Sequence, residues 1–140
     1  PLINASPEQA SQAIEATGIA LDLTLRELQT QLKTQSHPWE IAKGFDGACP
    51  ISEWIPVSEL NPLDEIDLQL SINNEIRQQG NSCNMLTPIP QLLAYMSSHF
   101  TLKPGDVVLT GTPAGVGALN QGDQLELILD RRYRFLGLVG

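Results

Sequence analysis

Alternation of apolar residues with a period of two constrains the fold more than any other feature of the chain. Residues 68–73 read Leu-Gln-Leu-Ser-Ile-Asn, and leucines recur at every second position from Leu125 to Leu129. This period places apolar side chains on one face of a β-strand. Asn73-Asn74 suits a type I′ turn, so we predict a hairpin that continues into residues 75–78. Residues 131–140 are expected to form a last edge strand.

Helix signals occupy shorter segments. Ser6-Pro7-Glu8-Gln9 has the form of a capping box with proline in the first turn. In residues 24–33, leucines recur at spacings that predict an amphipathic helix. Residues 85–100 show similar spacing, with two prolines near the start, and residues 39–43 suit one helical turn.

Composition narrows the class of protein and its partners. The chain has 140 residues, 41% hydrophobic and 17% charged, which predicts a single folded domain over residues 1–140. Its net charge of -8 repels nucleic acid and anionic membrane surfaces, so neither is an expected partner. Cys49 and Cys83 show no metal or disulfide spacing, and we expect both to be at least half-buried in a reducing cytoplasm.

Asp22 is the first candidate for chemistry, because it interrupts an apolar run of strand length at residues 18–24. An unpaired carboxylate inside such a strand would be costly. One interpretation is that Asp22 caps the following helix, its oxygen accepting a backbone N–H near Leu25. The other is that it binds a hard metal ion, since Mg²⁺ and Mn²⁺ prefer oxygen ligands. The spacing leaves both open.

Lys43 and the glycine-rich residues 110–117 also allow two interpretations each. Lys43 lies beside glycines at positions 44 and 47, and it is either a solvated surface residue or a charge that stabilises a developing oxyanion. An expected buried strand, Val107–Thr110, leads into the glycine-rich residues 110–117. Such a loop either connects two strands tightly or cradles a carboxylate with its backbone N–H groups.

Three motifs together resemble the fumarylacetoacetate hydrolase superfamily. They are Leu21-Asp22-Leu23-Thr24-Leu25-Arg26-Glu27-Leu28-Gln29, Trp39 with Ala42-Lys43-Gly44-Phe45-Asp46, and Leu109-Thr110-Gly111-Thr112-Pro113-Ala114-Gly115-Val116-Gly117. Their order and spacing match, and the similarity extends over nearly the whole chain. The resemblance is closest to small single-domain members, and it implies an α+β, mostly β fold, a mixed β-sandwich roll with a few short helices, and a homodimer.

The resemblance also implies roles for individual residues. Asp22 would be a metal ligand for Mg²⁺ or Mn²⁺, while Lys43 and Gln29 would be catalytic residues in the same pocket. Arg26, Gly111 and Thr112 would bind the substrate, the last two holding its carboxylate. The substrate would be a small anionic 2-oxo acid, which would react through a metal-bound enolate.

Which reaction follows from that enolate is left open. The first candidate is metal-dependent C–C hydrolysis of acylpyruvate or fumarylacetoacetate-type substrates. The alternatives are oxaloacetate decarboxylation, keto–enol tautomerisation, or an isomerisation like that of 2-hydroxyhepta-2,4-diene-1,7-dioate. A non-enzyme alternative is a truncated, non-catalytic remnant with the same fold.

The sequence departs from the family pattern at its beginning. Family members carry an upstream Glu-x-Glu that supplies two further metal carboxylates, and usually a lid with a His–Glu pair. Neither occurs in these residues, which open at Pro1-Leu2-Ile3. We therefore expect the C-terminal portion of a family domain that binds a metal ion weakly when isolated, because a single Asp is a poor Mg²⁺ site.

Overall fold

The computed structural model describes residues 1–140. The chain divides into two compact units, one made of Pro1–Ile19 with Glu53–Gly140 and the other of Ala20–Ser52. A single domain over the whole chain stays a prediction. The structure is α+β and mostly antiparallel β with a few short helices, as the sequence predicted. No helix has the length and apolar character needed to cross a membrane.

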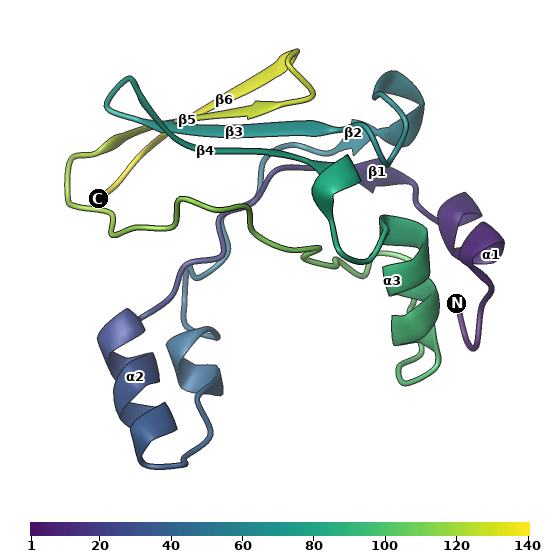
Figure 1. Ribbon diagram of the computed structural model, residues 1–140, viewed down its shortest axis with the longest axis horizontal. Coiled ribbons are helices and arrows are strands. Elements are labelled where there is room, and N and C mark those ends of the chain that lie inside the picture. Colours follow the sequence, from purple (N-terminus) through teal and green to yellow (C-terminus); the bar gives the residue numbers. More distant parts are fainter. The chain divides into compact units, whose positions relative to one another are not determined.

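The larger unit contains a four-stranded antiparallel sheet (Figure 1). Its strands are β3 (Asp67–Ile72), β4 (Glu75–Asn81), β5 (Gln124–Leu129) and β6 (Tyr133–Leu138), in the order β4-β3-β5-β6. Asn73 and Asn74 connect β3 to β4 with φ values of 52° and 68°. Positive φ at both central residues is the requirement of a type I′ turn. The predicted hairpin and edge strand are therefore confirmed.

The alternating leucines of β5 form the buried face of this sheet. Leu125, Leu127 and Leu129 are 6%, 9% and 1% exposed, whereas Gln124 on the opposite face is exposed. Leu70 of β3 lies opposite Leu127 and is buried as well. Each fully buried leucine side chain contributes about 2 kcal/mol to folding through apolar area removed from water. This face is the main apolar core of the larger unit.

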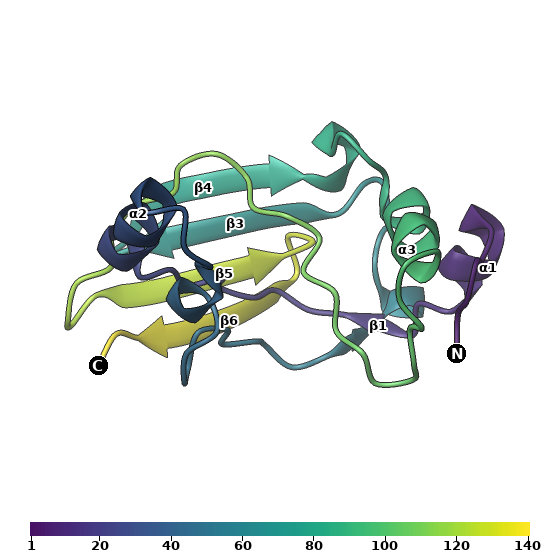
Figure 2. The same ribbon diagram turned by 90° about the horizontal axis from the view of Figure 1, so that it is seen from below.

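Two helices of the larger unit, α1 (Pro7–Gln12) and α3 (Ile89–Ser97), pack side by side in both views (Figures 1 and 2). The predicted capping box at the start of α1 is confirmed, because the Ser6 hydroxyl accepts from Gln9 N and the Gln9 side chain accepts from Ser6 N. The helix predicted within residues 85–100 is also confirmed, as α3. Ser97 links the two segments by accepting a hydrogen bond from Ala5 N at 2.9 Å.

Short elements complete the larger unit. β1 (Ala16–Thr17) and β2 (Ile55–Pro56) form a two-stranded antiparallel sheet. The 3₁₀ turns η2 (Val57–Glu59) and η3 (Ser82–Asn84) follow β2 and β4. These elements connect the main sheet to the helices within the unit.

The smaller unit contains α2 (Arg26–Thr34) and the 3₁₀ turn η1 (Glu40–Ala42), which confirm both helix predictions for this region. The strand predicted at residues 18–24 is wrong, because the chain there forms only an isolated antiparallel bridge between Ala20 and Ile51. Leu21 N donates to Pro50 O at 3.0 Å. Proline has no N–H to return that bond, which interrupts the ladder next to the bridge.

Two further predictions fail. Residues 107–110 form no strand and pair with none of the sheet strands, and Val107 and Leu109 are 49% and 47% exposed. An apolar, β-branched run is typical of a strand, but a strand forms only where a neighbouring segment offers backbone N–H and C=O groups to pair with. Cys49 and Cys83 are free and exposed rather than buried, since each lies in a loop or a short turn and not on a core face.

Candidate functional site

Asp22 and Lys43 form an ion pair within the smaller unit. Lys43 Nζ lies 2.6 Å from Asp22 Oδ1 and donates a hydrogen bond to Thr24 Oγ1 at 2.8 Å. The two charged side chains are partly exposed, 38% for Asp22 and 27% for Lys43. Solvent screening limits such a pair to about 1 kcal/mol of stability at most. The pair therefore contributes little to folding.

The backbone around the pair explains why these distant residues meet. Leu23 N donates to Ala48 O at 2.9 Å, and Leu25 N donates to Ala42 O at 3.0 Å. These bonds hold the two chain segments together on either side of the pair. Ala42, at the end of η1, is fully buried, which anchors the backbone directly before Lys43. Gly47, with φ of 79°, lets the chain turn back between Lys43 and Ala48.

The helix-cap interpretation of Asp22 is wrong. The N-cap position of α2 is Leu25, and no side chain forms a capping hydrogen bond there. Asp22 was expected to accept a backbone N–H near Leu25, but the N–H of Leu25 itself donates to Ala42 O. The surface interpretation of Lys43 stays open, because its side chain is 27% exposed although its ammonium contacts two oxygen atoms. The structure brings these two predicted site residues together.

Arg26 and Gln29 lie one helical turn apart near the beginning of α2. Arg26 is exposed and Gln29 is half-buried. Residues three apart on a helix are neighbours on its surface, so both side chains emerge from one side of α2. Neither adds a hydrogen bond to the Asp22–Lys43 pair. Their catalytic and substrate-binding roles stay predictions.

In the larger unit, the residues 110–117 (the glycine loop) lie against β4. Figure 2 shows this segment in yellow-green crossing the sheet near β4. The Gln78 side chain donates from Nε2 to Pro113 O at 2.9 Å and to Ala114 O at 3.5 Å. A Cβ added to Gly115, whose φ is 96°, would lie 2.1 Å from Arg77 O. Only glycine allows that approach.

Gly111 and Thr112 lie in the same loop, and both are exposed. Gly111 has φ of 133°, in the region that favours glycine, and open space surrounds it. A Cβ at Gly111 would meet no atom within 4 Å, so this part of the loop is not covered by the rest of the chain on that side. This arrangement is consistent with the predicted carboxylate cradle and does not test it.

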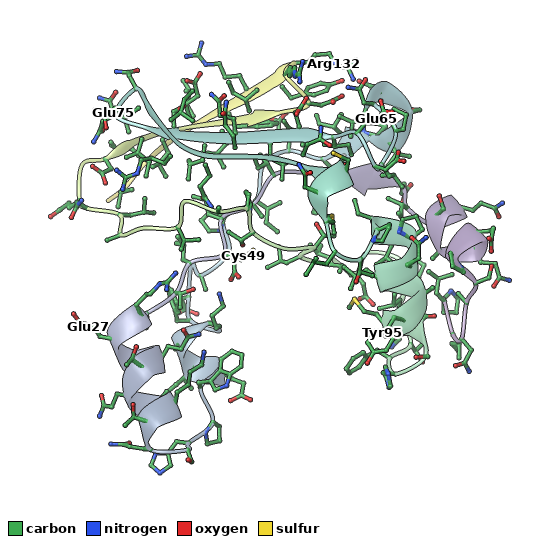
Figure 3. The ribbon with its side chains drawn as sticks, viewed as in Figure 1. Glu27, Cys49, Glu65, Glu75, Tyr95 and Arg132 are labelled. Atoms are coloured by element: carbon green, nitrogen blue, oxygen red, sulfur yellow. The ribbon has the colours of Figure 1, made fainter.

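Two buried carboxylates were not singled out from the sequence. Asp130 is 2% exposed and accepts hydrogen bonds from Asn61 N at 2.9 Å and Asn61 Nδ2 at 2.8 Å. Arg132, at the turn between β5 and β6 (Figure 3), pairs with Asp130 at 2.6 Å, which raises the pKa of its guanidinium. Asp123 accepts from Asn120 N and Asn73 Nδ2, both at 2.8 Å.

Both carboxylates hold turns together, because each accepts hydrogen bonds from a backbone N–H and an asparagine side chain. The hydrogen bond from Asn120 N, followed by that from Asn73, lowers the pKa of the Asp123 carboxyl. The signal that could have revealed Asp123 is its position in the turn sequence Gln-Gly-Asp, where Asp commonly accepts backbone N–H groups. Asp130 had no such signal, because its partner Asn61 is distant in the sequence.

The residues present do not complete a metal site. No three His, Cys, Asp or Glu side chains lie together so that they could hold a metal ion. Asp22 fits a single ligand position for Mg²⁺ or Mn²⁺, since it offers a hard, partly exposed carboxylate. Mg²⁺ gives up its water reluctantly and needs further oxygen donors. Asp22 can therefore contribute to a metal centre but does not form one alone.

Known proteins resemble this chain closely. The family model described as fumarylacetoacetate (FAA) hydrolase C-terminal matches residues 1–134. The oxaloacetate tautomerase YcgM of Escherichia coli is 50% identical over 130 residues, 92% of this chain and 59% of that protein. The human mitochondrial oxaloacetate tautomerase FAHD1 is 37% identical over 123 residues, 87% of this chain and 56% of that protein. The chain thus spans less than two thirds of these curated relatives.

Solved structures agree. A fumarylacetoacetate hydrolase family protein from Yersinia pestis has a TM-score of 0.94 and 51% identity, covering 99% of this chain and 65% of its own. Fumarylpyruvate hydrolase from Pseudomonas aeruginosa, solved with Mn²⁺ and pyruvate, has a TM-score of 0.92 and 31% identity, covering 99% and 59%. These likenesses confirm the fold class predicted from the sequence.

Proposed function

The chain belongs to the fumarylacetoacetate hydrolase family, and on that premise we propose that it acts in the keto–enol tautomerisation of small 2-oxo acids, with oxaloacetate as substrate. Relatives that are 50% and 37% identical carry the name oxaloacetate tautomerase. They favour this alternative over the C–C hydrolysis that the sequence placed first. Cytoplasmic location and a homodimer stay predictions.

The observation that carries the proposal is the fixed position of the Lys43 ammonium. Enolisation of a 2-oxo acid removes a proton from C3, and negative charge develops on the C2 oxygen. An oriented positive charge stabilises that oxygen more in the transition state than in the ground state, which accelerates the reaction. Asp22 and Thr24 hold Lys43 Nζ at 2.6 and 2.8 Å and so restrict its motion. The C3 proton passes to solvent water, and a proton from water is added to the C2 oxygen, so the enol forms with no net loss of a proton.

Each remaining predicted residue has a proposed role. The backbone N–H groups of the exposed residues Gly111 and Thr112, with the Thr112 hydroxyl, would hold the substrate carboxylate. Arg26 would add positive charge for the dianionic substrate, and Gln29 would hydrogen-bond a substrate oxygen. Asp22 would provide one oxygen ligand for Mg²⁺ or Mn²⁺. When bound, such an ion polarises the keto oxygen as a Lewis acid.

C–C bond hydrolysis is the second candidate, and one comparison favours it. Fumarylpyruvate hydrolase from Pseudomonas aeruginosa is 31% identical and was solved with Mn²⁺ and pyruvate. Decarboxylation has similar support from the Dictyostelium discoideum mitochondrial oxaloacetate decarboxylase, which is 39% identical over 119 residues. Lys43 would stabilise an enolate in all three reactions. The assay must therefore separate products rather than rely on substrate loss.

Three parallel assays with Mg²⁺ test the proposal. Decay of oxaloacetate enol absorbance reports tautomerisation, carbon dioxide release reports decarboxylation, and acetylpyruvate cleavage reports hydrolysis. We expect the first to be fastest and to fall by about a hundredfold or more in Lys43→Ala, the size of losing one oriented charge. Lys33→Ala is the matched control, because Lys33 is exposed on α2 and lies over Trp39.

The outcomes separate the alternatives. If acetylpyruvate cleavage is the fastest reaction, the tautomerase proposal is wrong and the hydrolase alternative takes its place. An absence of turnover in all three assays would leave the non-catalytic remnant. Equal rates for Lys43→Ala and the unmodified protein would remove Lys43 from the chemistry.

A further inference from the structure

We propose that Gln78 is a positioning residue, which fixes the glycine loop in the conformation that receives the substrate carboxylate. This inference rests on the proposed function, because it takes Gly111 and Thr112 as the carboxylate cradle. Gln78 acts through Pro113 and Ala114, whose carbonyls accept hydrogen bonds from its Nε2 at 2.9 and 3.5 Å.

A β-bulge aims the Gln78 side chain at the loop. Counted back from the hairpin turn, Ile72 pairs with Glu75 and Ser71 with Ile76, but Leu70 pairs with Gln78. Arg77 is therefore the extra residue of the bulge. Without it, Gln78 would lie opposite Gln69, because side chains alternate between the faces of a sheet. The bulge thus moves Gln78 to the face of Leu70.

The same bulge provides the second contact with the loop. The backbone oxygen of Arg77 approaches Gly115 so closely that a Cβ there would lie at 2.1 Å. Further along β4, a Cβ on Gly80 would lie 2.9 Å from Pro113 Cβ. Glycine on both sides of this contact lets strand and loop approach closely enough for the Gln78 hydrogen bonds. Bulges commonly re-aim side chains beside functional sites.

The chain transmits this anchoring directly to Thr112. Proline fixes its own φ, and it restricts the preceding residue to extended conformations. Thr112 precedes Pro113, whose carbonyl Gln78 holds. Three successive residues of the loop are thus restricted by one side chain and one ring. A cradle that is already ordered loses less entropy when a ligand binds.

Gln79 supplies a matched control. It is the next residue of β4, and its Nε2 donates to Gln69 Oε1 at 2.9 Å on the opposite face of the sheet. Gln78→Met and Gln79→Met each remove one amide and keep the side-chain volume similar. A structural role alone predicts similar losses for the two variants, confined to the thermal midpoint of unfolding.

The first experiment measures KM and kcat for oxaloacetate in both variants. We expect Gln78→Met to raise KM about five- to tenfold with kcat within about twofold. A loosened cradle would bind the substrate and the transition state less well by the same amount, about that of one hydrogen bond. Gln79→Met should change neither constant. A Gln78→Met variant with unchanged KM would overturn the proposal, as would an equal rise in KM for Gln79→Met.

The second experiment separates failure of this inference from failure of the proposed function. NMR order parameters of the Gly111 and Thr112 backbone amides, measured without substrate, should be lower in Gln78→Met and unchanged in Gln79→Met. If the unmodified protein turns over no 2-oxo acid, the tautomerase proposal fails, and these order parameters then decide whether Gln78 fixes the loop. Unchanged order parameters in Gln78→Met would overturn that statement.

Discussion

Lys43 Nζ lies 2.6 Å from Asp22 Oδ1, and the backbone bond from Leu25 N to Ala42 O joins the two segments beside that contact. The contact gives Asp22 a partner that the sequence did not suggest. A carboxylate that orients an ammonium can still bind a metal ion through its second oxygen. Asp22 therefore has two proposed tasks, orientation of Lys43 and provision of one ligand, and substitutions can separate them.

We predict that Asp22→Asn weakens Mn²⁺ binding and Lys43→Ala does not. An amide keeps one oxygen but loses the charge that attracts a divalent ion. For residues 1–140 alone, isothermal titration should show affinity weaker than micromolar, since no three ligand side chains come together. Micromolar Mg²⁺ affinity for this chain would contradict the prediction. Glu27→Gln, in the first turn of α2, is a control for nonspecific charge.

The sequence predicted elements whose causes are local. The hairpin follows from Asn73-Asn74, the first helix from its capping box, and the β5 face from alternating leucines. Each signal lies within a few residues of the structure that it specifies. The strands expected at residues 18–24 and 107–110 depend on partners elsewhere in the chain. Apolar composition alone could not supply that information.

The candidate site was likewise predictable only in part from the sequence. Residue types and order identified Asp22, Lys43 and the glycine loop through resemblance to a family, but gave no contacts between them. The Asp22–Lys43 pair depends on backbone bonds between distant segments. Gln78 was missed because its function depends on the bulge at Arg77, and no local pattern shows a register shift. Long-range pairing therefore decides what the motifs can do.

We predict that Gly115→Ala destabilises the protein more than Gly122→Ala. Both glycines have positive φ, 96° and 87°, so both variants carry a backbone penalty of about 1 kcal/mol. Only Gly115 also meets an atom, Arg77 O at 2.1 Å, whereas nothing lies within 4 Å of a Cβ at Gly122. The clash should raise the total loss for Gly115→Ala to about 2–3 kcal/mol. Urea unfolding measures both, and equal losses would contradict the close contact.

We predict that Asp130→Ala costs about 2 kcal/mol of unfolding free energy, because it removes a buried acceptor and leaves the part-buried Asn61 donors without their partner. Asp130→Asn should cost less, since the amide oxygen still accepts one bond and Asn tolerates the positive φ of 54°. Arg131→Ala is the control. Its guanidinium is 81% exposed and pairs with Asp67 at the surface, so its loss should cost about 0.5 kcal/mol.

The last prediction concerns pH. The hydrogen bonds from Asn120 and Asn73 lower the pKa of Asp123 below its ordinary value of 3.8. A carboxyl with a lower pKa in the folded state binds its proton more readily when unfolded, so unfolding is favoured by acid. Its stabilising contribution is full above about pH 4 to 5 and is lost as pH falls through the folded-state pKa.

Asp123→Asn should therefore be less stable than the unmodified protein at neutral pH. The difference between the two should shrink as pH falls from 5 toward 2, roughly the range in which Asp titrates. Chemical denaturation at several pH values measures this difference in unfolding free energy. The pKa of Asp67 is also lowered, mainly by Asn81, but Asp67 is present in both proteins and its contribution cancels in the difference. Asp64→Asn, at an exposed turn, should show no such trend. A constant difference across this range would show that the Asp123 bonds do not depend on its charge.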